Sequence, residues 1–128
     1  MPYTYPKVAD LEKTTMIGSH QCVALVRHYA GAPATSAWKQ GAAVVGNQFM
    51  RKGTAIATFI NGKYANQQHD NHAALYMGNT LNGILVMDQW MGKRPGTVSS
   101  RTLRAKGKHK NGLFVDPSNN ADAFFIIE

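Results

Sequence analysis

Apolar residues recur at helical spacing in one early stretch of this chain, residues 20–30, and Gly31 follows at a position typical of a helix C-terminus. The predicted helix carries an apolar stripe formed by Val23, Val26 and Ala30, with Leu25 and Tyr29 beside it. Ser36 is a candidate N-cap for a short second helix over residues 38–40, which Gly41 would end. The first 18 or so residues carry two prolines and are predicted to be irregular.

Beyond residue 53 the pattern changes to short apolar runs bounded by turn residues, which are typical of strands. The stronger runs are residues 54–60, 72–77 and 84–90, with a hairpin turn predicted at 78–83; weaker candidates are 98–104, 113–115 and 123–127. Helices first and strands afterwards indicate an α+β fold, with an N-terminal helix packed on a mostly antiparallel sheet. We expect a single domain over residues 1–128, a length that supports one hydrophobic core.

The composition narrows the class of protein. Hydrophobic residues make up 44% of the chain, which favours a packed globular domain over disorder. Cys22 is the only cysteine, so an intrachain disulfide is excluded. No apolar run is long enough for a membrane span, and the first residues lack the apolar segment of a Sec-type signal. We therefore expect the protein to remain in the cytoplasm or to be exported by a secretion system that recognises the folded protein.

The net charge of +7 is concentrated in one region, because no acidic residue lies between Gln89 and Val115. The basic residues there are Lys93, Arg94, Arg101, Arg104, Lys106, Lys108 and Lys110. Such a cluster attracts polyanions such as nucleic acid, anionic lipid or a bacterial cell wall, or it is only a solvated face. The region lacks zinc-finger and RNP motifs and the interleaved aromatics of single-strand binders, so nucleic acid is not the expected partner.

Cys22 falls at the predicted helix start, which makes it the first candidate for chemistry. With Ser19 as N-cap, His20, Gln21 and Cys22 occupy the first helical turn. The free N–H groups and the positive end of the helix dipole there favour thiolate over thiol. The alternative is that Cys22 is a small buried hydrophobic residue, as many free cysteines are.

His72 and Asp88 are the candidate base and its orienting carboxylate. His72 begins one strand of the predicted hairpin and Asp88 lies near the end of the other. Side chains alternate faces along a strand, so one parity of strand register places these two residues on the same face, opposite or diagonal to each other. A register shifted by one residue would place His72 and Asp88 on opposite faces of the sheet. The length of the hairpin loop permits both registers. The spacing of His69, Asp70 and His72 matches no known zinc motif, and we expect neither metal nor cofactor.

The segment Gly18-x-x-Gln21-Cys22-Val23-Ala24-Leu25-Val26 resembles the active-site helix of the CHAP and NlpC-type cysteine peptidases. Residues 71–76 resemble their histidine strand, and residues 86–90 the strand that follows. A closer resemblance, to the second family of type VI secretion amidase effectors and its domesticated relatives, covers almost the whole chain. It rests on residues 2–6, 22–26, 35–39, 53–59, 87–90 and 117–120.

This resemblance implies a minimal papain-like fold and an antibacterial toxin that is injected into the periplasm of a rival cell. Such toxins cut stem-peptide amide bonds of peptidoglycan, with the D-Ala–meso-diaminopimelate cross-link favoured, and a cognate immunity protein blocks the site. Cys22 would be the nucleophile and a backbone oxyanion donor, His72 the general base and acid, and Asp88 the residue that orients His72. The candidate substrate-binding residues are Gln21, Trp90, Arg101 and Arg104.

The second oxyanion donor stays unassigned, with His20 or an N-terminal tyrosine as the options. Two other functions stay open at this point. An acyltransferase would use the same pair of cysteine and histidine, and a polyanion-binding module would carry a thiol without a catalytic role.

Overall fold

The computed structural model describes residues 2–128 and contains one α-helix and one six-stranded sheet within that range. The helix α1 spans Cys22–Ala30. The strands are β1 (Gln40–Ala43), β2 (Ala55–Thr58), β3 (Ala73–Thr80), β4 (Gly83–Asp88), β5 (Ser99–Arg104) and β6 (Phe124–Ile127). The 3-10 helices are η1 (Val8–Leu11), η2 (Thr35–Ala37), η3 (Pro117–Asn119) and η4 (Ala121–Ala123).

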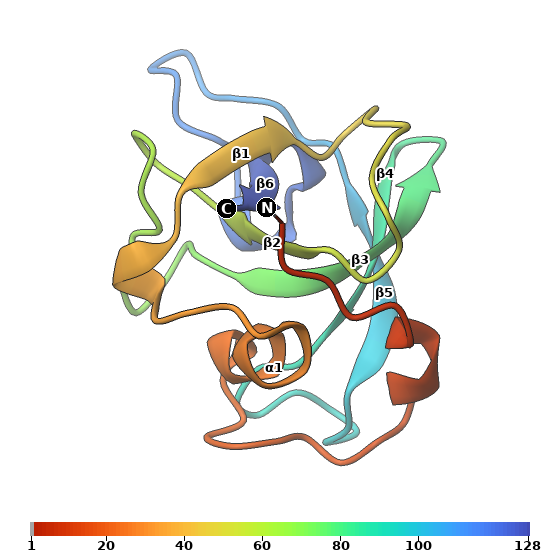
Figure 1. Ribbon diagram of the computed structural model, residues 1–128. Helices are drawn as coiled ribbons and strands as arrows, with labels where there is room; N and C mark the ends of the chain where they lie inside the picture. The colour runs from red at the N-terminus through yellow and green to blue at the C-terminus, as the bar shows by residue number, and fades with distance from the viewer. Residues whose placement is uncertain (1) are drawn as a thin grey trace.

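The strands lie in the order β1-β6-β2-β3-β4-β5, and every neighbouring pair is antiparallel. The last strand is thus inserted between β1 and β2, while β3, β4 and β5 follow one another as a meander. In Figure 1 α1 lies below the sheet, against β3, and β1 and β6 lie on the upper side. The predicted α+β architecture, with an N-terminal helix packed on an antiparallel sheet, is confirmed.

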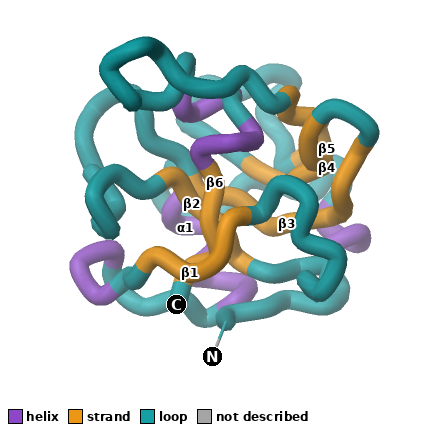
Figure 2. Tube along the Cα trace, turned by 90° about the horizontal axis from the view of Figure 1, so that it is seen from above, coloured by secondary structure: helices purple, strands orange, loops and turns teal. Residues whose placement is uncertain are grey.

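Alternation along the strands divides the apolar side chains between two clusters, one on each face of the sheet. The cluster on the α1 face includes Leu25 and Val26 of the helix with Ala55, Ala57, Ala73, Leu75 and Met87 of the sheet. The cluster on the other face includes Val44, Ile56, Ala74, Tyr76, Ile84, Val86, Leu103 and Phe124. All four residues of β2 are buried, as expected for a strand covered on both faces. Figure 2 shows the strands in the middle of the molecule, surrounded by helices and loops.

The start of α1 differs from the prediction by two residues. His20 has a φ of 67° and Gln21 is extended, so the helix begins at Cys22 with Gln21 as its N-cap. The Ser19 hydroxyl accepts a hydrogen bond from the Gln21 N–H instead of capping the helix. Gly31 ends the helix in the left-handed conformation, as predicted.

The predicted second helix at residues 38–40 is wrong. Residues 35–37 form a 3-10 turn, and Trp38 is already extended. The Lys39 N–H and carbonyl both bond to the backbone of Glu128, and Gln40 begins β1. Pairing with the C-terminal strand therefore decides the conformation of this segment, and local helix propensity does not.

All but one of the predicted strands are present, but their first and last residues differ from the prediction. The turn predicted at residues 78–83 is shorter, because β3 continues to Thr80 and β4 begins at Gly83. Residues 98–104 and 123–127 contain β5 and β6. Residues 113–115 form no strand, because only a single bridge joins Lys108 to Phe114.

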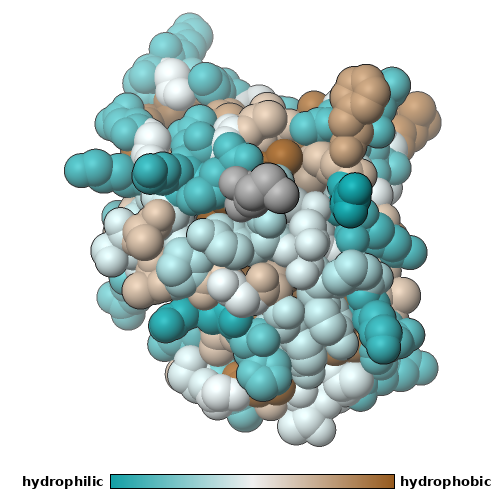
Figure 3. All heavy atoms as spheres, in the orientation of Figure 1, coloured by the Kyte–Doolittle hydropathy of each residue, from teal (hydrophilic) through white to brown (hydrophobic). Residues whose placement is uncertain are grey.

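No helix within residues 2–128 is both long and apolar enough to cross a membrane. The face of the molecule in Figure 3 is mostly hydrophilic, with a few hydrophobic side chains at its upper edge. The two most exposed large apolar side chains are Phe49 and Leu81, at 95% and 97% exposure.

Candidate active site

Cys22 is the first helical residue of α1, and its half-buried side chain packs against the cluster on the α1 face of the sheet. Within residues 2–128 its backbone N–H makes no hydrogen bond, as is usual in the first turn of a helix. The sulfur therefore lies beside free N–H groups at the positive end of the helix dipole.

Gln89, which follows β4, anchors the segment that leads into α1. Its side chain is fully buried. The amide oxygen accepts from the Ile17 N–H at 3.0 Å, and the amide nitrogen donates to the Ile17 carbonyl at 3.1 Å and to the Gln21 carbonyl at 2.9 Å. These three bonds join the helix start to the end of the strand that carries Asp88.

His72 and Asp88 lie on the same face of the sheet as diagonal neighbours. Tyr76 pairs with Val86 and Leu75 with Met87, a register that places Asp88 across from Ala74, two residues from His72. His72 Nε2 and Asp88 Oδ2 are 2.8 Å apart, and both side chains are buried. The register therefore has the parity that brings the two residues together.

Cys22, the first residue of α1, lies beside His72, the residue before β3. The His72 ring lies edge-on to Phe124 of the cluster opposite α1, at 6.2 Å between centroids. Because Nε2 faces Asp88, Nδ1 is the ring nitrogen left to exchange a proton with Cys22. Sulfur, imidazole and carboxylate thus form a row beside the start of β3.

Two cations also bind Asp88, Lys93 at the oxygen that does not contact His72 and Arg101 at the oxygen that does. The Lys93 ammonium donates to Asp88 Oδ1 at 2.8 Å, to the Asp88 carbonyl at 2.9 Å and to the Ser99 carbonyl at 3.0 Å. Arg101 Nε donates to Asp88 Oδ2 at 2.8 Å. Burial alone raises the pKa of Asp88, but His72, Arg101 and Lys93 outweigh burial and lower it to about 2. Asp88 is therefore an ionised, fully bonded carboxylate near neutral pH.

The pKa values of Cys22 and His72 move in opposite directions. Burial alone raises the pKa of Cys22, but the hydrogen bond and charge of His72, aided by Tyr64 and the Ala73 N–H, bring it below its ordinary value. Burial alone lowers the pKa of His72, whereas Asp88 and Cys22 raise it to about 9. These shifts favour a thiolate beside an imidazolium, the reactive state of a nucleophilic cysteine.

The candidate substrate-binding residues lie in different places. Trp90 and Arg101 are near the row: the Trp90 ring is 6.1 Å from the His72 ring, and the Arg101 guanidinium lies over Trp90 at 4.7 Å. Gln21 precedes Cys22, and its side chain is exposed. Arg104 is distant, because it pairs with Gly83 whereas Asp88 pairs with Ser99, a separation of five strand positions or roughly 17 Å.

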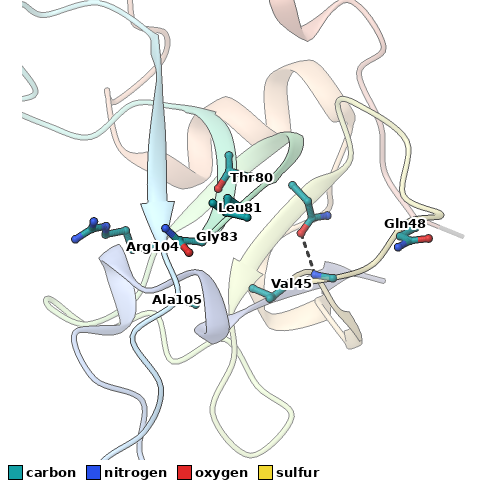
Figure 4. Close-up of a pocket in the computed structure, with 10 residues that line it drawn as sticks. Val45, Gln48, Thr80, Leu81, Gly83, Arg104 and Ala105 are labelled. Atoms are coloured by element: carbon teal, nitrogen blue, oxygen red, sulfur yellow. Dashed lines mark hydrogen bonds between the residues drawn. The ribbon is translucent and has the colours of Figure 1, made fainter.

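Arg104 lines a separate hollow of about 630 Å³ at the turn between β3 and β4, which contains none of the residues of the row. Figure 4 shows Arg104 and Ala105 beside Gly83, with Val45 and Gln48 on the other side of the hollow. This position does not support a role for Arg104 in contacting a substrate bound at Cys22.

The basic cluster predicted between Gln89 and Val115 is only partly a free surface. Lys93 is buried and Arg101 is half-buried, both against Asp88, and Lys106 pairs with Asp116 at 2.8 Å. The basic side chains of this region that remain exposed are Arg94, Arg104, Lys108 and Lys110, with Lys106 exposed in its ion pair. Residues 2–128 contain no group of three His, Cys, Asp or Glu side chains placed to hold a metal ion.

The sequence pattern does not identify four residues of this site, namely Tyr64, Asn71, Gln89 and Lys93. Tyr64 and Asn71 lie in a polar loop that has no hydrophobic periodicity, so the pattern assigns them no position. Gln89 lies in the predicted strand 84–90, where the pattern indicates only a strand residue. Lys93 belongs to the basic cluster, for which the sequence predicts a solvated or polyanion-binding surface and not a buried ion pair. The one usable signal was adjacency, because Asn71 and Gln89 are next to His72 and Asp88 in the chain.

The fold and this row define an α+β domain with a cysteine at a helix start and a histidine and an aspartate on adjacent strands. The family model described as "Domesticated amidase effector 2" matches residues 5–127. The type VI secretion amidase effector 2 protein of Salmonella typhi is 44% identical over 134 aligned positions, which cover 100% of both chains. Domesticated amidase effector 2 of Ixodes scapularis is 33% identical over 116 positions, covering 88% of this chain and 73% of that protein.

A solved structure of type 6 secretion amidase effector 2 superposes with a TM-score of 0.91 at 43% identity, covering 98% of this chain and 94% of that one. The chain therefore belongs to the type VI secretion amidase effector 2 family, which includes the domesticated relatives. Family membership, as expected from the sequence motifs, is confirmed, and it makes the protein an amidase effector of the type VI system.

Proposed function

We propose that this protein is a cysteine amidase that hydrolyses stem-peptide amide bonds of peptidoglycan, with Cys22, His72 and Asp88 as its catalytic row. The observation that carries the proposal is the contact of His72 Nε2 with the fully buried Asp88 carboxylate at 2.8 Å, which leaves Nδ1 to exchange a proton with Cys22. A nucleophile, a base and a group that orients the base are the parts that amide hydrolysis by covalent catalysis needs.

The reaction runs in two halves. The Cys22 thiolate attacks the amide carbonyl, an S–C bond forms, and the carbonyl electrons move onto oxygen. The Cys22 backbone N–H, which is free within residues 2–128, donates to that oxyanion. The intermediate collapses, His72 Nδ1 protonates the leaving amine, and the thioester remains. Water, deprotonated by His72, then hydrolyses the thioester and releases the acid.

The bond we propose is the D-Ala–meso-diaminopimelate cross-link, and the site of action is the periplasm of a target bacterium. This choice rests on the resemblance to the effector family, as does the proposal that a cognate immunity protein covers the site. The exposed Arg94, Lys108 and Lys110 would hold the enzyme on the anionic wall by long-range attraction.

Isolated sacculi test the activity and the bond together. Wild-type protein should release muropeptides shortened at the cross-link, identified by mass spectrometry, and Cys22→Ala should release none above background. His109→Ala is the matched control, because His109 is an exposed histidine in the loop after β5 and is not one of the candidate site residues. Release by Cys22→Ala at the wild-type rate would refute the mechanism.

The same assay separates the rival functions. An acyltransferase would attach an added amine acceptor to the acyl group, whereas a hydrolase releases the free acid. A polyanion-binding module would retain salt-sensitive binding in Cys22→Ala and release no muropeptides from any variant.

A further inference from the structure

Tyr64 places its hydroxyl beside the sulfur of Cys22. It lies in the loop between β2 and β3, where its ring is only 8% exposed. The Tyr64 oxygen is 3.7 Å from Cys22 Sγ, and the ring packs on Trp38 at 4.8 Å between centroids. Trp38 is itself held by a 2.8 Å hydrogen bond from its indole N–H to the Pro33 carbonyl. The hydroxyl is therefore carried on a buried ring with little freedom to move away from the sulfur.

Asn71 determines the direction of the Tyr64 proton. The Asn71 amide oxygen accepts from the Gln67 N–H at 2.6 Å, so its NH₂ group faces Tyr64 and donates to the hydroxyl oxygen at 3.2 Å. A hydroxyl carries one proton, and Asn71 needs none. Within residues 2–128 the sulfur of Cys22 is the other polar partner of this hydroxyl, so the proton points at the sulfur.

The ionisation of the site makes Tyr64 the donor. His72 lowers the pKa of Cys22, and a thiolate accepts hydrogen bonds but cannot donate them. Burial and the neighbouring thiolate raise the pKa of Tyr64, so the phenol keeps its proton at any pH at which the enzyme works.

We propose that Tyr64 is a catalytic residue, which donates a hydrogen bond to the Cys22 thiolate at rest and to the oxyanion once the S–C bond has formed. The oxyanion is two bonds from the sulfur, so a donor that reaches the sulfur needs only a small shift to reach the oxygen. The Cys22 backbone N–H is then one donor of the oxyanion hole and Tyr64 the second. No proton leaves Tyr64 during the reaction, because the proton of the leaving amine comes from His72.

This proposal rests on the proposed function for its second half only, and two measurements keep the halves apart. The first is the rate of Cys22 alkylation by iodoacetamide against pH, which reports the thiolate without any peptidoglycan. The second is kcat and KM for release of muropeptides from sacculi. Inactivity of the wild type on sacculi would refute the proposed function, and the alkylation profile would still test the Tyr64–Cys22 hydrogen bond.

Tyr64→Phe removes the hydroxyl and keeps the ring against Trp38. We expect its alkylation midpoint to move to higher pH, and kcat to fall about 10²-fold or more with KM nearly unchanged, the size of effect that loss of one oxyanion donor produces. Asn71→Asp should reproduce the alkylation shift with Tyr64 intact, because a carboxylate accepts the Tyr64 proton and turns it away from the sulfur.

Tyr29→Phe is the matched control, since it removes a tyrosine hydroxyl from the same helix as Cys22, and Tyr29 packs on Tyr5 and His28 instead of the row. It should leave both measurements unchanged. Thermal unfolding of each variant verifies that it folds. An alkylation profile or a kcat of folded Tyr64→Phe equal to that of wild type would overturn the proposal.

Discussion

His72 and Asp88 face each other because Met77 is an extra residue in β3. Gly78 pairs with Leu85, but Tyr76 pairs with Val86, so Met77 forms a bulge between them. Without the bulge Asp88 would pair with Leu75, and its side chain would point to the opposite face from His72. One inserted residue therefore decides whether the 2.8 Å contact between these two side chains exists.

The first prediction concerns the charge on Asp88. Asp88→Asn keeps the shape of the side chain but cannot stabilise an imidazolium, so the pKa of His72 should fall and kcat on sacculi should drop about 10²- to 10⁴-fold. The pH profile of Cys22 alkylation measures the change at the row directly. Asp116→Asn is the control, because Asp116 is an exposed carboxylate bonded to Lys106. An unchanged alkylation profile in Asp88→Asn would contradict the role given to Asp88.

The second prediction concerns Lys93, which is buried with all three of its N–H donors bonded. Lys93→Met leaves part of the Asp88 carboxylate without a partner, and the free energy of unfolding should fall by about 3–5 kcal/mol. Urea denaturation measures this loss. Lys110→Met, at an exposed lysine of the same region, should change stability by no more than about 0.5 kcal/mol. Equal urea midpoints for the two variants would show that the buried ion pair does not stabilise the fold.

The third prediction is the pH dependence of stability in acid. The pKa of Asp88 is lowered from 3.8 to about 2 on folding, so its contribution to stability is present above pH 3.8. That contribution is lost as the pH falls towards 2 and the carboxylate is protonated in the folded state. Urea denaturation between pH 5 and pH 2 should show a larger loss in wild type than in Asp88→Asn. The loss that remains in Asp88→Asn comes from other carboxylates such as Asp116, whose pKa is lowered by its hydrogen bond to Lys106.

His72 gives the opposite dependence in alkali. Its pKa is raised from 6.5 to about 9 on folding, so its contribution is complete below pH 6.5 and is lost as the pH rises through 9. The difference in unfolding free energy between wild type and His72→Gln should therefore shrink between these two values. A difference that grows with pH would mean that the folded protein holds His72 neutral.

The fourth prediction concerns Gln89 and the position of the helix start. Gln89→Leu removes three hydrogen bonds to Ile17 and Gln21. The Ile17 N–H is left without an acceptor, whereas the Ile17 and Gln21 carbonyls keep the bonds they accept from the His20 and Ala24 N–H groups. Leaving one buried N–H unsatisfied costs about 1–3 kcal/mol, so we expect the free energy of unfolding to fall by about that amount.

Hydrogen exchange at the Ile17 amide should become faster in Gln89→Leu, because its acceptor is gone. Gln48→Leu, a change of the same type in a surface loop, is the control. Exchange at Ile17 as slow as in wild type would show that the segment is held by other contacts.

Much of the fold follows from local pattern. The helix with Cys22 at its start, the strands that hold His72 and Asp88, and the order of helix before sheet all follow from periodicity and turn residues. These features depend on residues a few positions apart, which share one face of an element whatever the rest of the chain does. The short helix expected at residues 38–40 does not form. There, backbone pairing with Glu128, a residue far away in the chain, outweighs the local helix propensity.

By itself the sequence determined which residues are the candidates for chemistry, namely one thiol at a helix start, one imidazole and one carboxylate on neighbouring strands. Only the tertiary structure decided that they meet, because the bulge at Met77 sets the register and no local pattern predicts a bulge. Tertiary structure also placed Lys93 beneath Asp88 and Tyr64 beside Cys22, and it kept Arg104 at the far end of the sheet. These positions depend on contacts between residues far apart in the chain, which hydrophobic periodicity does not encode.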